Sequence, residues 1–343
     1  MAAAKKALQI RLPPLPSIKD IIRLYKLRAL RELSQNFLME PRIIDKIVNA
    51  AGNLEKHVVC EVGPGPGGIT RSIIQRAPRK VILIEKDRRF IPSLELVADA
   101  CRNQVDVDII PGDILKTDIG HFIPEDVKTD WHDSPPPVHL IGNLPFSVST
   151  ILIIRWLEMI SKQEGPWSFG RARMTLTFQK EVAERMAARI LSDQRCRLSV
   201  MCQNWCTVRH KFDISGGAFL PKPDVDVGVV TLTPLKNPII QHPFKMVEKV
   251  VRQIFSMRQK YSIRGAQTLF PEDAREEMAL RMYKMADIDP VTRPYQIANM
   301  EFARIVDAYS EIIKQYPEFE HYDYRAKKVK YNNTEEAEDL IYN

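Results

Sequence analysis

The chain has 343 residues, 45% of them hydrophobic, which is enough for a large and a small domain with separate cores. No apolar run approaches the roughly 20 residues that a membrane span needs. Its net charge of +7 fits an ordinary basic surface and a nucleic-acid-binding surface equally well. The five cysteines form no C-x-x-C pair, so we expect no disulfide framework and no metal site.

Residues 1–33 form a basic arm, with eight Lys and Arg side chains against two acids. Ile18, Ile21 and Ile22 fall near one face of a helix that also carries basic residues. Three interpretations stay open: a mitochondrial transit peptide, an arm that contacts RNA phosphates, and a helix docked on the surface. At the other end, residues 327–343 are polar and charged, which predicts a loose tail.

Short apolar runs alternate with helical segments between residues 34 and 237. Such alternation is typical of buried parallel strands in βα units. The runs are 58–62, 81–84, 105–110, 138–141, 174–178, 204–210 and 227–232. We therefore predict an α/β domain over residues 34–237. Helical periodicity over 244–255, 274–286 and 299–314 predicts a second domain at 238–326.

Polar residues follow the first four predicted strands. The segment Gly63–Gly68 follows the first, Glu85 ends the second, and Asp113 and Asn143 come after the third and fourth. Open parallel sheets bind ligands at the carboxyl ends of their strands, so these residues should line one edge. The G-x-G-x-x-G pattern and Glu85 suit NAD as well as S-adenosylmethionine, so an NAD dehydrogenase is a competing hypothesis. Asp113, placed to accept a cofactor adenine amine, and Asn143 favour an S-adenosylmethionine-dependent methyltransferase.

The tetrapeptide Asn143–Phe146 is the predicted reacting centre. The N6 amine of adenine is a poor nucleophile because its lone pair is delocalised, so an enzyme must align the amine and localise that pair. The side-chain oxygen of Asn143 and the carbonyl of Leu144 are predicted to accept its two N–H bonds. Pro145 stiffens the turn, and Phe146 offers a stacking face worth roughly 1–3 kcal/mol per base. A plain β-turn is the alternative for this tetrapeptide.

Several motifs occur in the order seen in ribosomal RNA adenine dimethyltransferases, and the chain resembles this family from about Ser34 to Tyr309. The motifs are Ser34–Leu38, Glu61–Gly67, Glu85–Asp87, Gly112–Ile114, Asn143–Phe146 and Phe219–Pro223. The basic arm and the Pro-rich connection before Val138 resemble the mitochondrial branch of this family.

The resemblance implies a fold: a Rossmann-like class I methyltransferase with a seven-stranded, mostly parallel sheet and a small C-terminal helical domain. It also implies S-adenosylmethionine as cofactor and successive N6,N6-dimethylation of two adjacent adenosines in a hairpin of mitochondrial small-subunit (12S) rRNA. Such a protein would act in the matrix, support assembly of the small ribosomal subunit and work as a monomer. The alternative is a factor that binds mitochondrial RNA polymerase and DNA and assists transcription independently of methylation.

Site residues follow from their positions in the motifs. The implied cofactor-binding residues are Gln35, Asn36, Leu38, Gly63, Gly65, Glu85, Lys86, Asp113, Ile114 and Asn143. The implied substrate-binding residues are Phe146, Phe219, Arg258 and Lys260. The family tetrapeptide often ends in Tyr where this chain has Phe146, and Gln259 interrupts a basic cluster. The group expected to face RNA is Lys245, Lys249, Arg252, Arg258, Lys260 and Arg264.

Overall fold

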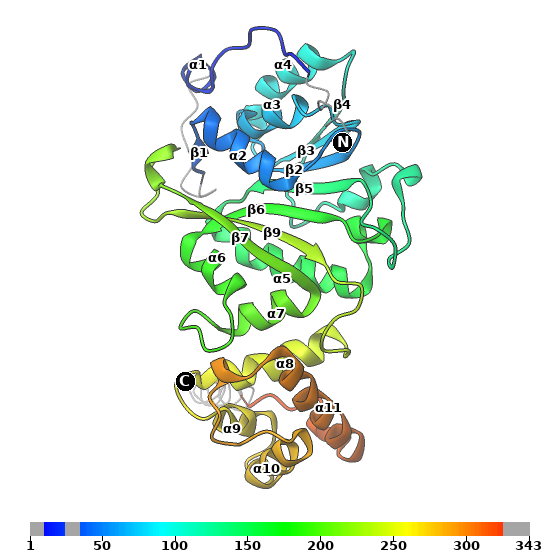
Figure 1. The fold of residues 1–343 in the computed structure, drawn as a ribbon, viewed down its shortest axis with the longest axis vertical. Coiled ribbons are helices and arrows are strands. Elements are labelled where there is room, and N and C mark those ends of the chain that lie inside the picture. The colour runs from blue at the N-terminus through cyan, green and yellow to red at the C-terminus, as the bar shows by residue number, and fades with distance from the viewer. Residues whose placement is uncertain (1–9, 25–34, 325–343) are drawn as a thin grey trace, which may run out of the picture. The chain divides into compact units, whose positions relative to one another are not determined.

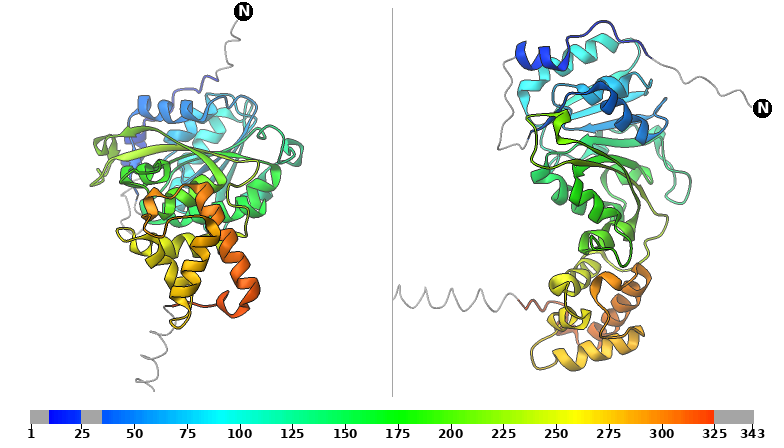
Figure 2. Two further views of the ribbon diagram at one scale, coloured as in Figure 1. Left: turned by 60° about the horizontal axis from the view of Figure 1, so that its bottom comes forward. Right: turned by 60° about the vertical axis from the view of Figure 1, so that its left-hand side comes forward.

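The computed structural model describes residues 10–24 and 35–324, which divide into two compact units (Figure 1, with further views in Figure 2). The first unit takes in the described chain up to Ala187 and the segment Trp205–Lys236. The second takes in Ala188–Asn204 and the described chain from Asn237 onward. Residues 188–204 lie within the range 34–237 that we predicted as the first domain, whereas their contacts group them with the helices of the second unit. The predicted loose tail lies outside the described residues.

Part of the basic arm is described, and it packs on the first unit. Helix α1 (Ile18–Leu24) has Ile21 fully buried against Phe37 and Phe90. The guanidinium of Arg71 donates a hydrogen bond of 2.7 Å to a backbone carbonyl just before this helix. Within the described part of the arm, the helix is therefore docked on the surface. The rest of the arm lies outside the described residues.

The first unit is built on a seven-stranded sheet with the order β4-β3-β2-β5-β6-β9-β7. Its strands are β2 (Val58–Val62), β3 (Lys80–Glu85), β4 (Asp106–Pro111), β5 (Val138–Asn143), β6 (Arg173–Gln179), β7 (Cys206–Ile214) and β9 (Val227–Pro234). Neighbours from β4 to β6 run parallel, and β9 is antiparallel to both β6 and β7. The predicted seven-stranded, mostly parallel sheet is confirmed. Its strand order reverses between β2 and β5, and such a switch point opens a crevice at the carboxyl ends of the strands.

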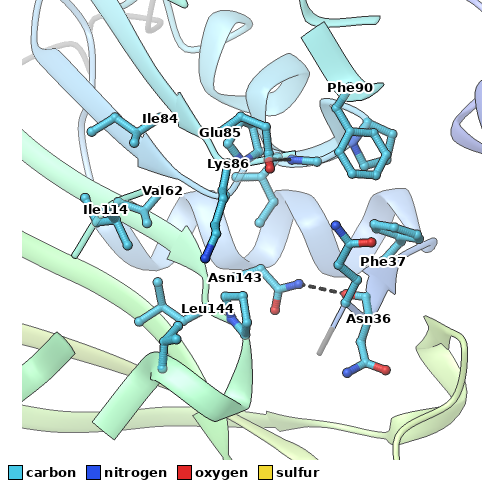
Figure 3. A pocket seen from close by; sticks show the side chains of 18 of the residues that line it. Asn36, Phe37, Val62, Ile84, Glu85, Lys86, Phe90, Ile114, Asn143 and Leu144 are labelled. Atoms are coloured by element: carbon cyan, nitrogen blue, oxygen red, sulfur yellow. Dashed lines mark hydrogen bonds between the residues drawn. The ribbon is translucent and has the colours of Figure 1, made fainter. Parts of the chain in front are cut away.

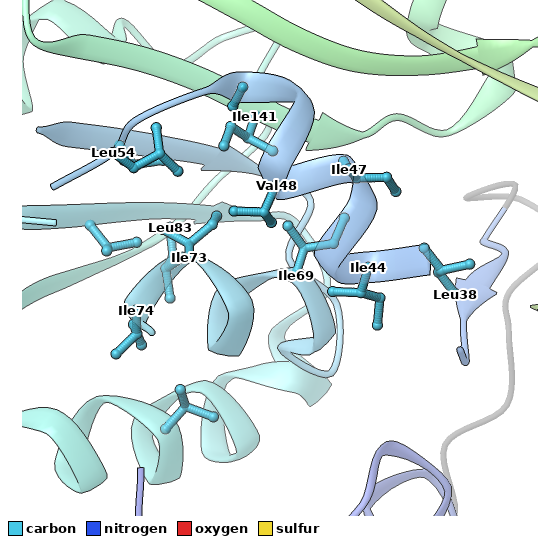
Figure 4. Packing of buried hydrophobic residues seen from close by; sticks show 14 of the residues in the cluster. Leu38, Ile44, Ile47, Val48, Leu54, Ile69, Ile73, Ile74, Leu83 and Ile141 are labelled. Carbon is cyan, nitrogen blue, oxygen red and sulfur yellow. The ribbon is translucent and has the colours of Figure 1, made fainter. Parts of the chain in front are cut away.

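Three helices in the first half of this unit pack together: α2 (Pro41–Ala51), α3 (Gly68–Ile74) and α4 (Ile91–Cys101). In α2, apolar side chains recur every three or four residues, so one face of the helix is buried. Figure 4 shows Ile47 and Val48 of α2 and Ile73 of α3 packing with Leu83 and Ile141 of the sheet. Burial of each such side chain contributes about 1.5–3 kcal/mol. This core holds the first strands, and with them the strand ends, in a fixed arrangement.

Two further helices of the first unit follow strands directly. Helix α5 (Phe146–Lys162) begins three residues after β5 ends, and α6 (Lys180–Ala187) begins immediately after β6. Helix α5 packs on β6, and its Trp156 ring contacts Trp167 edge-on with 5.8 Å between ring centroids. The start of α5 therefore lies beside the carboxyl end of β5.

The second unit is helical, in agreement with the predicted fold class. Its helices are α7 (Arg197–Trp205, which ends at the unit boundary), α8 (Phe244–Ile254), α9 (Ser262–Ala266), α10 (Arg275–Ala286) and α11 (Asn299–Gln315). In α8, Val247, Val250, Val251 and Ile254 recur at helical spacing and are fully buried. None of the helices described in either unit is long and apolar enough to cross a bilayer.

Candidate active site

A pocket lies at the carboxyl ends of β2, β3 and β5, where residues of distant motifs meet (Figure 3). Every predicted site residue of the first unit lines it: Gln35, Asn36, Leu38, Gly63, Gly65, Glu85, Lys86, Asp113, Ile114, Asn143, Leu144, Pro145, Phe146 and Phe219. Figure 3 shows Glu85 and Phe90 on one side of the pocket and Asn143 and Leu144 on the other. Parallel strands present their carboxyl ends on one edge, which explains why these motifs come together.

A two-stranded ribbon joins the first and the last motif. Strand β1 (Phe37–Leu38) pairs antiparallel with β8 (Phe219–Leu220), so Leu38 lies opposite Phe219. Phe219 is 4% exposed, and it both belongs to the hydrophobic core and lines the pocket. The ring of Phe37 contacts that of Phe90 edge-on, with 5.4 Å between centroids. The ribbon thus supplies one apolar wall of the pocket.

The glycine-rich loop is tied to the end of β3 by Glu85. Gly63 and Gly65 have φ angles of +66° and +54°, a region that residues with a side chain rarely adopt. The two carboxylate oxygens of Glu85 accept hydrogen bonds from the backbone N–H of Gly65 at 2.9 Å and of Asp87 at 2.7 Å. Burial raises the pKa of Glu85 above its ordinary value, although these hydrogen bonds oppose the shift. A carboxylate has about four lone-pair sites, so Glu85 can still accept a hydrogen bond from a ligand.

Lys86 and Asp113, both predicted at the cofactor site, contact each other. The ammonium of Lys86 lies 2.9 Å from one carboxylate oxygen of Asp113, and the backbone N–H of Leu115 donates to the other oxygen at 3.0 Å. Burial acts to raise the pKa of Asp113, but these two hydrogen bonds outweigh it and hold the pKa below its ordinary value. A ligand amine at Asp113 must therefore share the carboxylate with Lys86 or displace it.

The side-chain amide of Asn143 is held at both ends. Its Nδ2 donates to the backbone carbonyl of Asn36 at 3.0 Å (dashed line in Figure 3). Its Oδ1 accepts a hydrogen bond from the hydroxyl of Thr177 at 2.8 Å. An amide oxygen has two lone pairs, so Oδ1 keeps one for a ligand in the pocket. The ring of Phe146, at the start of α5, lines the same pocket and packs partly on the core.

A second carboxyl group, Glu61 of β2, lies buried just below the loop. It is 1% exposed and accepts a hydrogen bond from the hydroxyl of Thr70 at 2.6 Å. Burial raises the pKa of Glu61 to about 8, and the nearby charge of Glu85 adds to the shift. Glu61 is therefore largely protonated at neutral pH in the folded protein, whereas it is ionised in the unfolded chain.

This difference gives a pH dependence that Glu61→Gln should remove. Because the folded-state pKa is raised from 4.5 to about 8, the folded state binds the extra proton, and stability falls as pH rises through that interval. We expect the free energy of unfolding of Glu61→Gln, relative to the wild type, to increase by about 1.4 kcal/mol per pH unit there. Urea denaturation at several pH values measures this. The exposed Glu125→Gln is the control, and parallel curves for the wild type and Glu61→Gln would contradict the assignment.

Several residues of the site were not predicted from the sequence, among them Phe90 and Thr177. Phe90 ends a short 3-10 turn (Arg88–Phe90) after β3 and lines the pocket. Its place a few residues after Glu85 was the only signal in the sequence. Thr177 reaches Asn143 because the neighbouring strands β5 and β6 pair these two residues directly. A strand register of this kind is not visible in the sequence.

Arg258 and Lys260, expected to bind substrate, belong to the second unit and do not line this pocket. The guanidinium of Arg258 donates to the backbone carbonyl of Arg195 at 3.0 Å and to a second carbonyl, and it lies over the ring of Tyr295. Lys249 likewise donates to two carbonyls of its own unit, at 3.2 and 2.6 Å. Lys260 instead lines an exposed hollow. The structure thus gives Arg258 and Lys249 contacts inside the helical unit.

The fold and the pocket define a class of protein. A dimethyladenosine transferase from Plasmodium falciparum superimposes with a TM-score of 0.64 at 22% identity, covering 80% of this chain and 98% of that one. The 23S rRNA methyltransferase ErmE does so with a TM-score of 0.54 at 20% identity, covering 80% and 100%. The chain has the Rossmann-like class I methyltransferase fold.

The sequence comparisons then give the family. Residues 27–309 match the ribosomal RNA adenine dimethylase family. The chain is 52% identical over 341 residues to the mitochondrial dimethyladenosine transferase 1 of Homo sapiens. The aligned region covers 99% of this chain and 98% of the human protein. The chain belongs to the ribosomal RNA adenine dimethylase family, and its enzyme class is rRNA adenine dimethyltransferase. The competing NAD dehydrogenase hypothesis is wrong.

Proposed function

We propose that this protein uses S-adenosylmethionine to dimethylate N6 of two adjacent adenosines in a hairpin of mitochondrial 12S rRNA, and so supports assembly of the small ribosomal subunit in the matrix. The observation that carries the proposal is the amide of Asn143. Both of its ends are held by the protein, and it lies in one pocket with the carboxylates of Glu85 and Asp113. The relatives of this protein are named as mitochondrial enzymes, which supports a mitochondrial location.

The pocket residues fit S-adenosylmethionine by the chemistry of their side chains. Apolar walls from Val62, Ile84 and Ile114 stand beside the carboxylates of Glu85 and Asp113, which suits an adenosine with its hydroxyls and amine. Glu85 would accept from the ribose hydroxyls with its spare lone pairs, and Asp113 would accept the adenine amine. When bound, S-adenosylmethionine supplies a methyl group on a cationic sulfonium.

The residues of the tetrapeptide would hold the target amine. Oδ1 of Asn143 accepts one N–H through its remaining lone pair, and the carbonyl of Leu144 accepts the other. Both contacts favour the amine geometry in which the nitrogen lone pair is localised and aimed along the line of transfer. Phe146 stacks on the base, which must be unpaired or flipped out to enter the pocket.

A basic surface on the second unit is the proposed contact with the RNA. Its exposed cations Lys260, Arg264 and Arg293 line one hollow with the half-exposed ring of Tyr261. Among the described residues, no carboxylate lies within ion-pair distance of these three cations. Cations that no carboxylate neutralises are available to phosphates, and an aromatic ring among them suits an unpaired base.

Replacing Lys260, Arg264 and Arg293 together by Ala should weaken hairpin binding and leave the chemical step intact. We expect KM for the hairpin to rise more than tenfold, and the slope of log affinity against log salt to become shallower by about 2. The matched control replaces Arg102, Lys162 and Lys314, which have the same total charge but form ion pairs at the C-terminal ends of helices. Equal salt slopes for the two triple variants would place the RNA contact elsewhere.

The proposed cellular function can be tested by mass spectrometry of mitochondrial small-subunit rRNA from cells that lack this protein. We expect dimethyladenosine to disappear from 12S rRNA and to return on expression of the wild type. Undiminished dimethyladenosine would refute the proposal. If reconstituted transcription by mitochondrial RNA polymerase depended on the protein and survived Asn143→Ala, the alternative role in transcription would take its place.

A further inference from the structure

Among the described residues, Thr177 is the one residue outside the sequence motifs whose side chain forms a hydrogen bond with the amide of Asn143. It lies on β6, directly opposite Asn143 in the register of the parallel strands. Its side chain is fully buried, and its hydroxyl donates to Oδ1 of Asn143 at 2.8 Å. We propose that Thr177 is a positioning residue for methyl transfer, which orients the Asn143 amide for the target amine. This inference rests on the proposed function of Asn143.

The direction of both hydrogen bonds follows from their partners. The backbone carbonyl of Asn36 can only accept, so the Nδ2 end of the Asn143 amide must face it. Oδ1 then faces β6, where the hydroxyl of Thr177 donates to it. Rotation of the amide about its Cβ–Cγ bond breaks both hydrogen bonds at once. One lone pair of Oδ1 therefore keeps a fixed direction before substrate arrives.

Burial makes the hydroxyl of Thr177 hard to replace. Because the side chain has no exposed surface, water has no direct access to the position of a missing hydroxyl. Valine has nearly the same shape as threonine but cannot donate, so Thr177→Val frees the Oδ1 end of the amide. The population of amides aimed at the target falls, and the rate constant of transfer falls with it.

The second methyl transfer should depend on this orientation more than the first. Unmodified adenosine offers two N–H bonds to the two acceptors, whereas the monomethylated amine has only one. With one N–H left, alignment of the amine relies on one hydrogen bond. When Oδ1 of Asn143 is the acceptor, a mobile amide loses that hydrogen bond and the alignment with it. Thr177→Val should therefore release monomethyladenosine, while the wild type goes on to the dimethyl product.

Kinetics on a short rRNA hairpin test the proposal with three variants. For Thr177→Val we expect kcat to fall by about tenfold, the size of one hydrogen bond, with KM and cofactor affinity within about twofold of the wild type, and monomethyladenosine to accumulate. Thr177→Ser keeps the hydroxyl and should recover most of kcat and the dimethyl product. The matched control is Thr175→Val, a buried threonine on the same strand whose hydroxyl contacts His139 instead.

A second measurement does not depend on activity. In protein labelled with 15N-asparagine, we expect the side-chain amide of Asn143 to give two sharp, slowly exchanging proton signals, assigned by their loss in Asn143→Ala. In Thr177→Val these signals should move towards the chemical shifts of an exposed asparagine, and their protons should exchange faster with solvent. Rapid exchange of these protons with solvent already in the wild type would overturn the proposal even if Thr177→Val failed to fold. Unchanged kcat and an unchanged product ratio in a folded Thr177→Val would also overturn it. A wild type that cannot methylate the hairpin would instead refute the proposed function, and the role of Thr177 in holding the amide would then be tested by the amide signals alone.

Discussion

Replacing Asn143 with Ala should lower the rate of methyl transfer to a short rRNA hairpin by about 10³-fold, the range seen when a preorganised polar contact at a reacting centre is removed. The variant loses the acceptor for the target amine, while Glu85, Asp113 and the glycine loop remain. We therefore expect S-adenosylmethionine to bind within about tenfold of the wild type. Single-turnover kinetics at saturating cofactor and RNA measure the chemical step, and calorimetric titration measures cofactor binding.

Stability needs its own measurement, because Asn143→Ala leaves the carbonyl of Asn36 and the hydroxyl of Thr177 without this partner. The cost of such a loss is about 1–3 kcal/mol, which urea denaturation can detect. The exposed Asn103→Ala is the control for the substitution itself. Methyl transfer at the wild-type rate by folded Asn143→Ala would remove Asn143 from the reacting centre.

Glu85→Gln should weaken binding of S-adenosylmethionine by about 100-fold. The carboxylate accepts from the N–H groups of Gly65 and Asp87 at the same time, and an amide of the same shape must turn its own NH₂ towards one of these donors. Loss of a hydrogen bond to a charged group costs about 1.5–3 kcal/mol, and the ribose hydroxyls lose an acceptor as well. Calorimetric titration of the wild type and the variant gives the ratio of affinities.

Glu95→Gln on the exposed face of α4 is the matched control for Glu85→Gln, since it makes the same chemical change away from the pocket. We expect it to bind the cofactor as the wild type does. A titration with NAD should give no binding to the wild type. Equal cofactor affinity of Glu85→Gln and the wild type would exclude Glu85 from the cofactor site.

The composition of the pocket could be predicted because four apolar runs stop at recognisable residues. β2 is followed by the loop from Gly63, β3 ends at Glu85, and Asp113 and Asn143 mark the ends of β4 and β5. Parallel strands in βα units place these ends on one edge whatever the details of packing. Local pattern and the general geometry of the fold class were therefore sufficient for these residues.

Contacts that depend on strand register or on the return of the chain could not be predicted. The pairing of Leu38 with Phe219 and that of Asn143 with Thr177 join segments with no shared periodicity. The charge of Arg258 suggested a phosphate contact, but charge alone does not show whether a guanidinium faces solvent or backbone carbonyls. Residues 188–204 follow a β strand and a helix in the chain, yet their partners lie in the later helices.

The central claim is that this pocket dimethylates adenosine in rRNA, and mass spectrometry of a methylated hairpin tests it most directly. The purified protein is incubated with the 12S rRNA hairpin and S-adenosylmethionine that carries a deuterated methyl group, and the RNA is then digested. We predict two adjacent adenosines that each carry two labelled methyl groups on N6. A hairpin without labelled N6,N6-dimethyladenosine, treated with folded protein that binds the cofactor, would contradict the account.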